Sequence, residues 1–258
     1  MKKHLVKRIS VACILTRREM LGFIGGTTAV SLIGCLRGHS ASVVLTNSLS
    51  QVPTSTVATP SCTVRPEQTQ GPYFVDEKLN RSDIRFDPSD GLVKQGVPLW
   101  LVFQVSQVND LSCTPLSNAT VDVWHCDAEG IYSDVNDPSF NTVGKKFLRG
   151  YQVTNANGTA EFVTIYPGWY PGRAVHIHFK IRTNSASQPS YEFTSQLYFD
   201  DALTDRVHAQ APYAARGQRT QKNDQDGVFR DGGEQLMLQI TEVAEGYIGR
   251  FDIALARE

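Results

Sequence analysis

The stretch AVHIHFKIR, residues 174–182, decides the fold class, because apolar and polar side chains alternate along it. In an extended strand successive side chains point to opposite faces. The apolar residues would therefore share one face, while His176 and His178 project from the other. The alternation predicts a β-strand with one face in a core and two imidazoles about 6–7 Å apart at their bases on the other face.

Further β patterns lie on both sides of this stretch. Runs rich in β-branched, aromatic or alternating residues occur at residues 99–108, 121–124, 160–165, 191–199, 235–243 and 247–255. Residues 115–118 predict a turn, and Asn157-Gly158 predicts a hairpin turn. Only residues 202–215 could hold a turn or two of helix. About seven or eight short strands around one core predict an all-β protein, a single β-sandwich of transthyretin or immunoglobulin type with long loops around the site.

The first 35 residues predict an export signal. A basic start is followed by an uncharged run, residues 20–34, which is shorter than the ~20 residues that a membrane-spanning helix needs. Residues 16–21, TRREML, resemble a twin-arginine signal, which implies export of an already folded protein. Residues 32–35, LIGC, resemble a bacterial lipobox. Either Cys35 becomes a lipid-anchored N-terminus, or it is a small residue in a signal that is cut later, near Ala41.

Charge and composition exclude two classes of partner and predict the domain organisation. Residues 1–34 hold six Lys and Arg residues against one Glu, so the remainder has 19 basic and 25 acidic residues, a net charge of −6. A body of that sign has no electrostatic footprint for nucleic acid or anionic membranes. Residues 36–61 are rich in Ser, Thr, Val and Pro and predict a flexible tether. We therefore expect one folded domain over residues 62–258 in the periplasm or cell envelope, with any membrane attachment only through Cys35.

Three cysteines follow the leader, which allows at most one internal disulfide in an oxidising compartment. Cys113 precedes a predicted strand and Cys126 ends it, so these two would lie ~20 Å or more apart. The preferred pairing is therefore Cys62 with Cys126.

An HxH pair alone does not specify a metal site, since it also fits the polar face of a half-buried strand. Two tyrosines add context: Tyr170 lies six residues before His176 in PGWYPG, and Tyr132 lies in WHCDAEGIYS, residues 124–133. This arrangement resembles the intradiol ring-cleavage dioxygenases, non-haem ferric enzymes that open catechols between their two hydroxyls. The resemblance covers most of residues 62–255. It includes TQGPYF at residues 69–74, Arg173 before the HxH pair, and Gln196 on the next strand.

The resemblance implies that Tyr132, Tyr170, His176 and His178 bind Fe(III). Two phenolates and a hydroxide would balance a trivalent ion, and hard anionic oxygens favour Fe(III) over Fe(II). The substrates would be a catechol and dioxygen, and the product a muconate-type diacid, with no reductant required.

Three catalytic roles are carried over in the same way. Arg173 would stabilise the negative charge on the bound ring, and Gln196 would hydrogen-bond the same oxygens or the dioxygen region. Tyr170 would be the ligand that leaves when the catechol binds and would then act as an internal base.

Other interpretations fit parts of the pattern. Arg173 also fits a surface ion pair, and Gln196 a sheet-surface glutamine. The whole chain could be a zinc hydrolase that uses the HxH pair with a carboxylate such as Asp127, or a non-catalytic transthyretin-like binding module of the envelope. Better-known intradiol enzymes have a longer loop between the second tyrosine and the first histidine, whereas only residues 171–175 intervene here. The rim should therefore be more open. The sequence specifies neither the catechol nor an oligomeric state.

Overall fold

The structure is a computed structural model that describes residues 62–109, 112–185 and 188–256, without the side chains of residues 184–185 and 188–189. The predicted export signal over residues 1–35, including the Cys35 site, and the tether over residues 36–61 lie outside the described residues. Within the described part, no helix is both long and apolar enough to cross a membrane.

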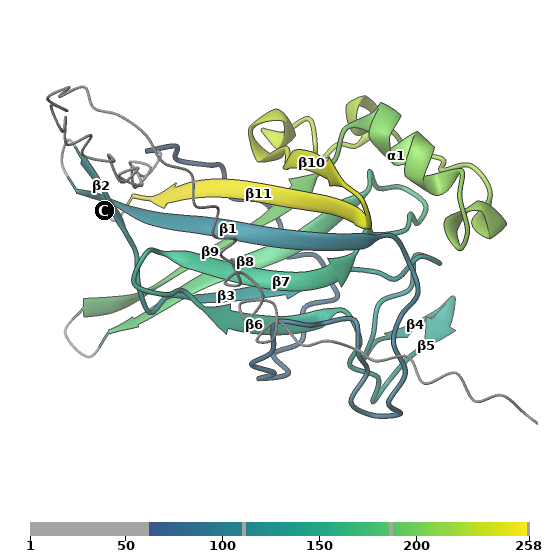
Figure 1. The fold of residues 1–258 in the computed structure, drawn as a ribbon, viewed down its shortest axis with the longest axis horizontal. Coiled ribbons are helices and arrows are strands. Elements are labelled where there is room, and N and C mark those ends of the chain that lie inside the picture. Colours follow the sequence, from purple (N-terminus) through teal and green to yellow (C-terminus); the bar gives the residue numbers. More distant parts are fainter. Residues whose placement is uncertain (1–61, 110–111, 186–187, 257–258) are drawn as a thin grey trace, which may run out of the picture. The chain divides into compact units, whose positions relative to one another are not determined.

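The larger sheet has five strands arranged around β1 (Pro98–Asn109) (Figure 1). β1 pairs in parallel with β11 (Gly246–Leu255), so the first and last strands lie side by side, and β10 (Gln239–Val243) pairs with β11. β7 (Thr159–Ile165) and β2 (Ser112–Pro115) both run antiparallel to β1, along different parts of its length. The alternation along β1 buries every second side chain, as expected for a strand with one face in a core.

The second sheet has four antiparallel strands in the order β6-β3-β8-β9. Their bounds are Arg149–Val153, Thr120–Trp124, His176–Ser185 and Gln188–Tyr198, respectively. A separate two-stranded sheet pairs β4 (Asn136–Asp137) with β5 (Phe140–Asn141). The prediction of a mostly β protein is confirmed, and its strands form three sheets.

One hydrophobic core joins the inner faces of the two larger sheets. The Phe103 ring of β1 lies 5.3 Å from the Phe179 ring of β8 and 6.1 Å from the Phe162 ring of β7. Because Phe179 faces this core, His176 and His178 face the opposite, outer side of the four-stranded sheet. Both histidines are nevertheless buried, at 2% and 1% exposure, because other segments of the chain cover that side.

Helical segments gather between β9 and β10. The predicted helix is α1 (Asp201–His208), whose N-cap Asp200 accepts a hydrogen bond from the Leu203 N–H at 2.8 Å. Three short 3-10 helices follow, at Tyr213–Arg216 (η1), Asn223–Gln225 (η2) and Gly233–Leu236 (η3). The strand predicted over residues 235–243 therefore begins later, at Gln239.

The hairpin predicted at Asn157-Gly158 is wrong. The turn exists, with Gly158 at φ +75°, but β6 before it belongs to the four-stranded sheet and β7 after it pairs with β1. The Val105 N–H donates to the Gly158 carbonyl at 2.8 Å, so the turn packs on β1. The turn thus carries the chain from one sheet to the other instead of joining two paired strands.

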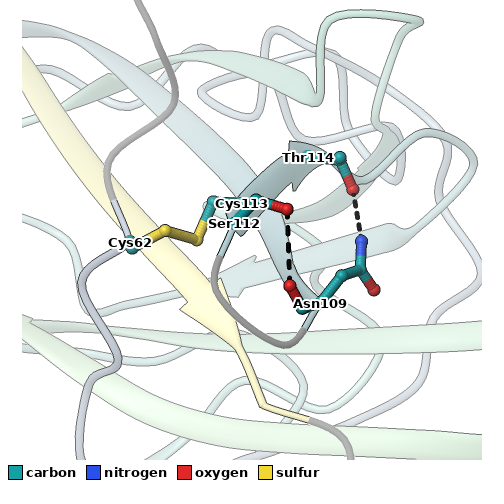
Figure 2. The surroundings of a disulfide bond; sticks show 5 residues. All are labelled: Cys62, Asn109, Ser112, Cys113 and Thr114. Carbon is teal, nitrogen blue, oxygen red and sulfur yellow. Dashed lines mark hydrogen bonds between the residues drawn. A yellow bond between two sulfur atoms is a disulfide. The ribbon is translucent and has the colours of Figure 1, made fainter.

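The preferred disulfide is also wrong: Cys62 pairs with Cys113, with their Cα atoms 5.4 Å apart (Figure 2). Cys113 lies on β2, opposite Val108 of β1, and Val64 bridges Ala254 of β11, so both cysteines lie at one end of the larger sheet. Cys126 is free and buried, and its Sγ lies 3.5 Å from the Gly168 carbonyl oxygen in a different part of the fold.

Candidate metal centre

The two histidines of β8 point side by side from the outer face of the four-stranded sheet. Their Nε2 atoms are 3.1 Å apart. On the neighbouring strand β3, Trp124 lies directly opposite His178, and the two rings stack 5.0 Å apart at an interplanar angle of 5°. Regular strand pairing thus holds His178 against a flat aromatic wall.

The two tyrosines come from loops beside these histidines. The Oη of Tyr170, in the segment between β7 and β8, lies 3.0 Å from the His176 Nε2 atom. The Oη of Tyr132, in the segment after β3, lies 3.5 Å from the same atom. The four residues predicted as metal ligands are therefore brought together, with two phenol oxygens and two imidazole nitrogens converging on one point.

Two glycines let the tyrosine-bearing loops approach each other. A Cβ added at Gly168 would lie 2.5 Å from the carbonyl oxygens of Asp127 and Ala128. A Cβ added at Gly130, where φ is +78°, would lie 2.2 Å from the Trp169 carbonyl oxygen. Any larger residue at either position would push the two loops apart.

The histidines are neutral and His176 has a defined tautomer. Burial, with Arg173 nearby, lowers the pKa of His176 to about 3, and burial followed by the proximity of His176 holds the pKa of His178 well below its ordinary value. His176 Nδ1 lies 2.6 Å from the Ala174 carbonyl oxygen, which only accepts, so Nδ1 carries the hydrogen. The lone pair of His176 Nε2 therefore faces the point of convergence.

The tyrosines are protonated in the absence of a cation. Burial raises the pKa of Tyr132 well above its ordinary value, and burial also raises that of Tyr170, although Arg173 acts in the opposite direction. A strongly Lewis-acidic ion could convert both phenols to phenolates, since nearby positive charge lowers the pKa of an acidic group. The donor set therefore fits a hard trivalent cation.

The zinc-hydrolase alternative requires a carboxylate as a third ligand beside the histidine pair, and the described residues place none there. Among the described residues, no group of three or more His, Cys, Asp or Glu side chains is placed to hold a metal ion. Asp127 instead accepts hydrogen bonds from Lys94 Nζ at 2.8 Å and from the backbone N–H groups of Glu129 and Ile131. Its carboxylate stabilises the turn that leads to Tyr132, so it does not join the histidine pair.

Arg173 and Gln196 lie beside the histidines and contact each other. The Arg173 Nη2 donates to Gln196 Oε1 at 2.6 Å, and Gln196 Nε2 donates to the Thr69 carbonyl at 2.9 Å. Gln196 lies opposite His178 and is fully buried, so it is not a sheet-surface glutamine. The Arg173 side chain is 18% exposed and its ion pair is largely shielded from solvent, unlike the surface ion pair considered from the sequence.

Asp226 is a residue of this site that the sequence did not reveal. Its Oδ2 accepts hydrogen bonds from Arg173 Nε at 3.0 Å and from the Ala174 N–H at 2.8 Å, and its side chain is 1% exposed. Burial pushes the pKa of Asp226 upward, but the Ala174 N–H and the Arg173 charge outweigh it and hold the pKa below its ordinary value. Asp226 is therefore a carboxylate that fixes the arginine and the entry to β8.

His125, beside the Tyr132 loop, is not free to bind a metal. Its Nδ1 lies 2.8 Å from the Cys126 carbonyl oxygen and its Nε2 lies 2.6 Å from Thr164 Oγ1. Both ring nitrogens are thus engaged in a buried link between the two larger sheets.

The family model described as dioxygenase matches residues 69–228, which is more than half of the chain and includes every residue of this site. The chain belongs to the intradiol ring-cleavage dioxygenase family. Its fold is similar to that of a solved family member, and its four converging side chains lie within the matched segment.

Three similar members of the intradiol dioxygenase family are informative. The protocatechuate 3,4-dioxygenase beta chain of Burkholderia cepacia is 32% identical over 157 residues, covering 56% of this chain and 65% of that protein. The hydroxyquinol 1,2-dioxygenase of Corynebacterium glutamicum is 27% identical over 215 residues, covering 72% of this chain and 62% of that protein. This chain thus spans less than two thirds of either curated relative. The solved intradiol ring-cleavage dioxygenase from Tetranychus urticae has a TM-score of 0.64 and 32% identity, covering 76% of this chain and 94% of that chain.

Proposed function

We propose that the protein cleaves the ring of a catechol-type compound between its two hydroxyls, using dioxygen and a ferric ion held by Tyr132, Tyr170, His176 and His178. The observation that carries this proposal is the convergence of two phenol oxygens and two neutral imidazole nitrogens at 3.0–3.5 Å. The names of the relatives, which refer to catechol-type substrates, support it.

A ferric ion bound by these four residues would supply a Lewis acid that makes the ring of a bound catechol reactive toward dioxygen. The protein supplies the geometry. Trp124 stacks on His178, and the Ala174 carbonyl orients His176, so neither imidazole can turn away. The product would be a muconate-type diacid.

Arg173 provides the electrostatic part of the proposal. Its guanidinium is held by Asp226 on one side and Gln196 on the other, in a largely buried position. A positive charge fixed in this way stabilises negative charge on a bound ring without having to reorganise. Gln196, held by the Thr69 carbonyl, places its amide beside the same space.

Tyr170 is the ligand that we expect to leave when the substrate binds. Tyr170 is half-buried and follows a Gly- and Pro-rich loop, whereas Tyr132 is 1% exposed. A released Tyr170 phenolate can accept a proton from the second catechol hydroxyl and hold it at Oη, because burial keeps the pKa of this phenol high.

We also infer that the two facing sheets form the predicted sandwich, with residues 125–148 and 166–175 as its active-site loops. Export to the periplasm or cell envelope remains part of the proposal. The Cys62–Cys113 disulfide supports it, since such bonds form and persist in oxidising compartments.

The proposal is tested with iron-loaded full-length protein. We expect about one iron per chain, a reddish colour from phenolate-to-iron charge transfer, and uptake of one dioxygen for each catechol converted to a diacid. Catechol, hydroxyquinol and protocatechuate would form the first substrate panel. A colourless protein with stoichiometric zinc, or a coloured protein that consumes no dioxygen with any catechol, would contradict it.

A further inference from the structure

A cavity of about 410 Å³ opens beside Tyr170, and neither Arg173 nor Gln196 is among the residues that line it. Two of its lining residues, Tyr73 and Tyr170, contact the Tyr132 ring, with centroid distances of 4.7 and 5.7 Å. The cavity therefore lies one aromatic ring away from the point where the four donor atoms converge. Pockets of ~300–1,000 Å³ typically hold drug-sized molecules, so this space exceeds the needs of an unsubstituted catechol.

Two short elements build the walls of this cavity. The β4–β5 pair contributes Asp137, Ser139 and Phe140, and the C-terminal end of η1 contributes Arg216. Tyr73 and Phe140 form an aromatic wall, with their ring centroids 6.4 Å apart. Such a wall suits an apolar arm extending from a ring bound at the metal centre.

Arg216 is held in place with most of its guanidinium unused. Its Nε donates to the Trp169 carbonyl at 2.8 Å, and its Cζ lies 4.9 Å from the centre of the Trp169 ring. Gly130 lies against the same guanidinium, because a Cβ added at Gly130 would lie 3.3 Å from Arg216 Cζ. In the described part of the chain, Arg216 has no acidic partner and its Nη1 and Nη2 donate no hydrogen bond.

The other charged residue of the cavity is already satisfied. Asp137 Oδ2 accepts a hydrogen bond from the Tyr73 hydroxyl at 2.7 Å, and Oδ1 accepts one from the Ser139 N–H at 2.8 Å. Asp137 keeps its negative charge, but hydrogen bonds from the protein already occupy both of its oxygens, so the charged group with unused hydrogen-bonding atoms in this cavity is Arg216.

We propose that this cavity selects catechols bearing a side arm of several atoms that ends in a carboxylate, with Arg216 binding that carboxylate. The proposal rests on the proposed function, because the ring itself would be held at the metal centre. A guanidinium presents two parallel N–H donors that match a carboxylate, and the aromatic wall would cover the arm. Arg216 is a specificity-determining residue in this proposal and contacts only the arm.

The test compares two substrates with arms of different charge. We expect the kcat/KM of iron-loaded protein to be higher for 3-(3,4-dihydroxyphenyl)propionate than for 4-methylcatechol. In Arg216→Gln the ratio of the two kcat/KM values should fall about tenfold, the size expected for a lost hydrogen bond to a charged group. Arg216→Lys should keep most of the ratio, because it retains the charge, although both variants lose the Nε contact with Trp169. Arg206→Gln, at an exposed position on α1, is the matched control and should leave the ratio unchanged.

A second measurement removes turnover from the comparison. Without dioxygen, the dissociation constants of the same two catechols can be read from the change in visible absorption, and we expect the same selective loss in Arg216→Gln. Equal losses in the Gln and Lys variants, or a wild-type preference for 4-(2-aminoethyl)catechol over the propionate, would overturn the proposal. If the iron-loaded protein binds these catechols with the expected preference but cleaves none, the proposed function fails while the cavity assignment stands.

Discussion

At the scale of single residues, we expect the fixed positive charge of Arg173 to increase the rate of ring cleavage. If the guanidinium stabilises charge that develops only as the ring is activated, Arg173→Leu keeps the iron and the colour but lowers kcat by ~10²-fold or more. Arg173→Lys should rescue only part of this loss, since a point charge cannot reproduce the planar fork of donors. Metal analysis and steady-state kinetics measure both effects.

Arg173→Leu also leaves the buried Asp226 carboxylate without its cation, which is costly in itself. The double variant Arg173→Leu/Asp226→Asn removes that unpaired charge and serves as the control. If the double variant regains normal turnover, the charge of Arg173 has no role in the reaction.

Asp226 gives a second prediction at this scale. Because its Oδ2 binds both Arg173 Nε and the Ala174 N–H, Asp226→Asn should loosen the guanidinium and lower kcat by about tenfold, while KM changes little. The iron content should stay the same, since the four proposed ligands remain. Asp224→Asn, at an exposed neighbouring position, is the matched control. A loss of iron in Asp226→Asn would show that the residue supports the metal centre as a whole.

At the scale of elements, β8 shows what a sequence pattern can and cannot predict. The period-two alternation of residues 174–182 places His176 and His178 on one face, and the structure confirms that placement. The strand β6 was missed, since RGYQV carries no clear alternation. The hairpin prediction failed because a turn signal such as Asn-Gly does not specify which sheet its flanking strands join. Asp226 was missed because it lies 53 residues from Arg173 and reaches it only through tertiary packing.

The strand also provides the test of the metal ligands. His176→Ala and His178→Ala each remove one of four proposed protein ligands, so each purified variant should lose its iron and its colour. Lys180 occupies the next position on the same face of β8, where it pairs with Glu192 and lies over the Phe74 ring. Lys180→Ala should therefore keep the iron. Full iron retention and activity in either histidine variant would show that the HxH pair is only the polar face of a strand and binds no metal.

At the scale of the whole molecule, the site exists because segments from distant parts of the sequence cover the outer face of one sheet. Gly71 lies against the His178 ring and Phe74 packs on Trp124, which places the TQGPYF segment over β3 and β8. The resemblance identified this segment from its residues, but its position could not be read from local periodicity.

The disulfide error has the same cause, because local patterns do not specify which distant segments lie side by side. Rise per residue correctly kept Cys113 from Cys126, yet only the parallel pairing of β1 with β11 explains why Cys62 reaches Cys113.

The last prediction concerns this disulfide, which joins the start of the described domain to an edge strand of the larger sheet. The bridge closes a loop with a sequence separation of 51 residues, so its loss should lower the free energy of unfolding by about 2–4 kcal/mol, mainly by releasing the unfolded chain. The proposed metal centre lies on the other sheet, so Cys62→Ser/Cys113→Ser should keep its iron below the unfolding transition. Urea unfolding with and without reductant measures the difference, with Ser112→Ala beside the bridge as the control. If the double variant is as stable as the oxidised wild type, the bridge does not stabilise the fold. If it loses iron while folded, the two sheets are coupled more tightly than their separate hydrogen-bond networks indicate.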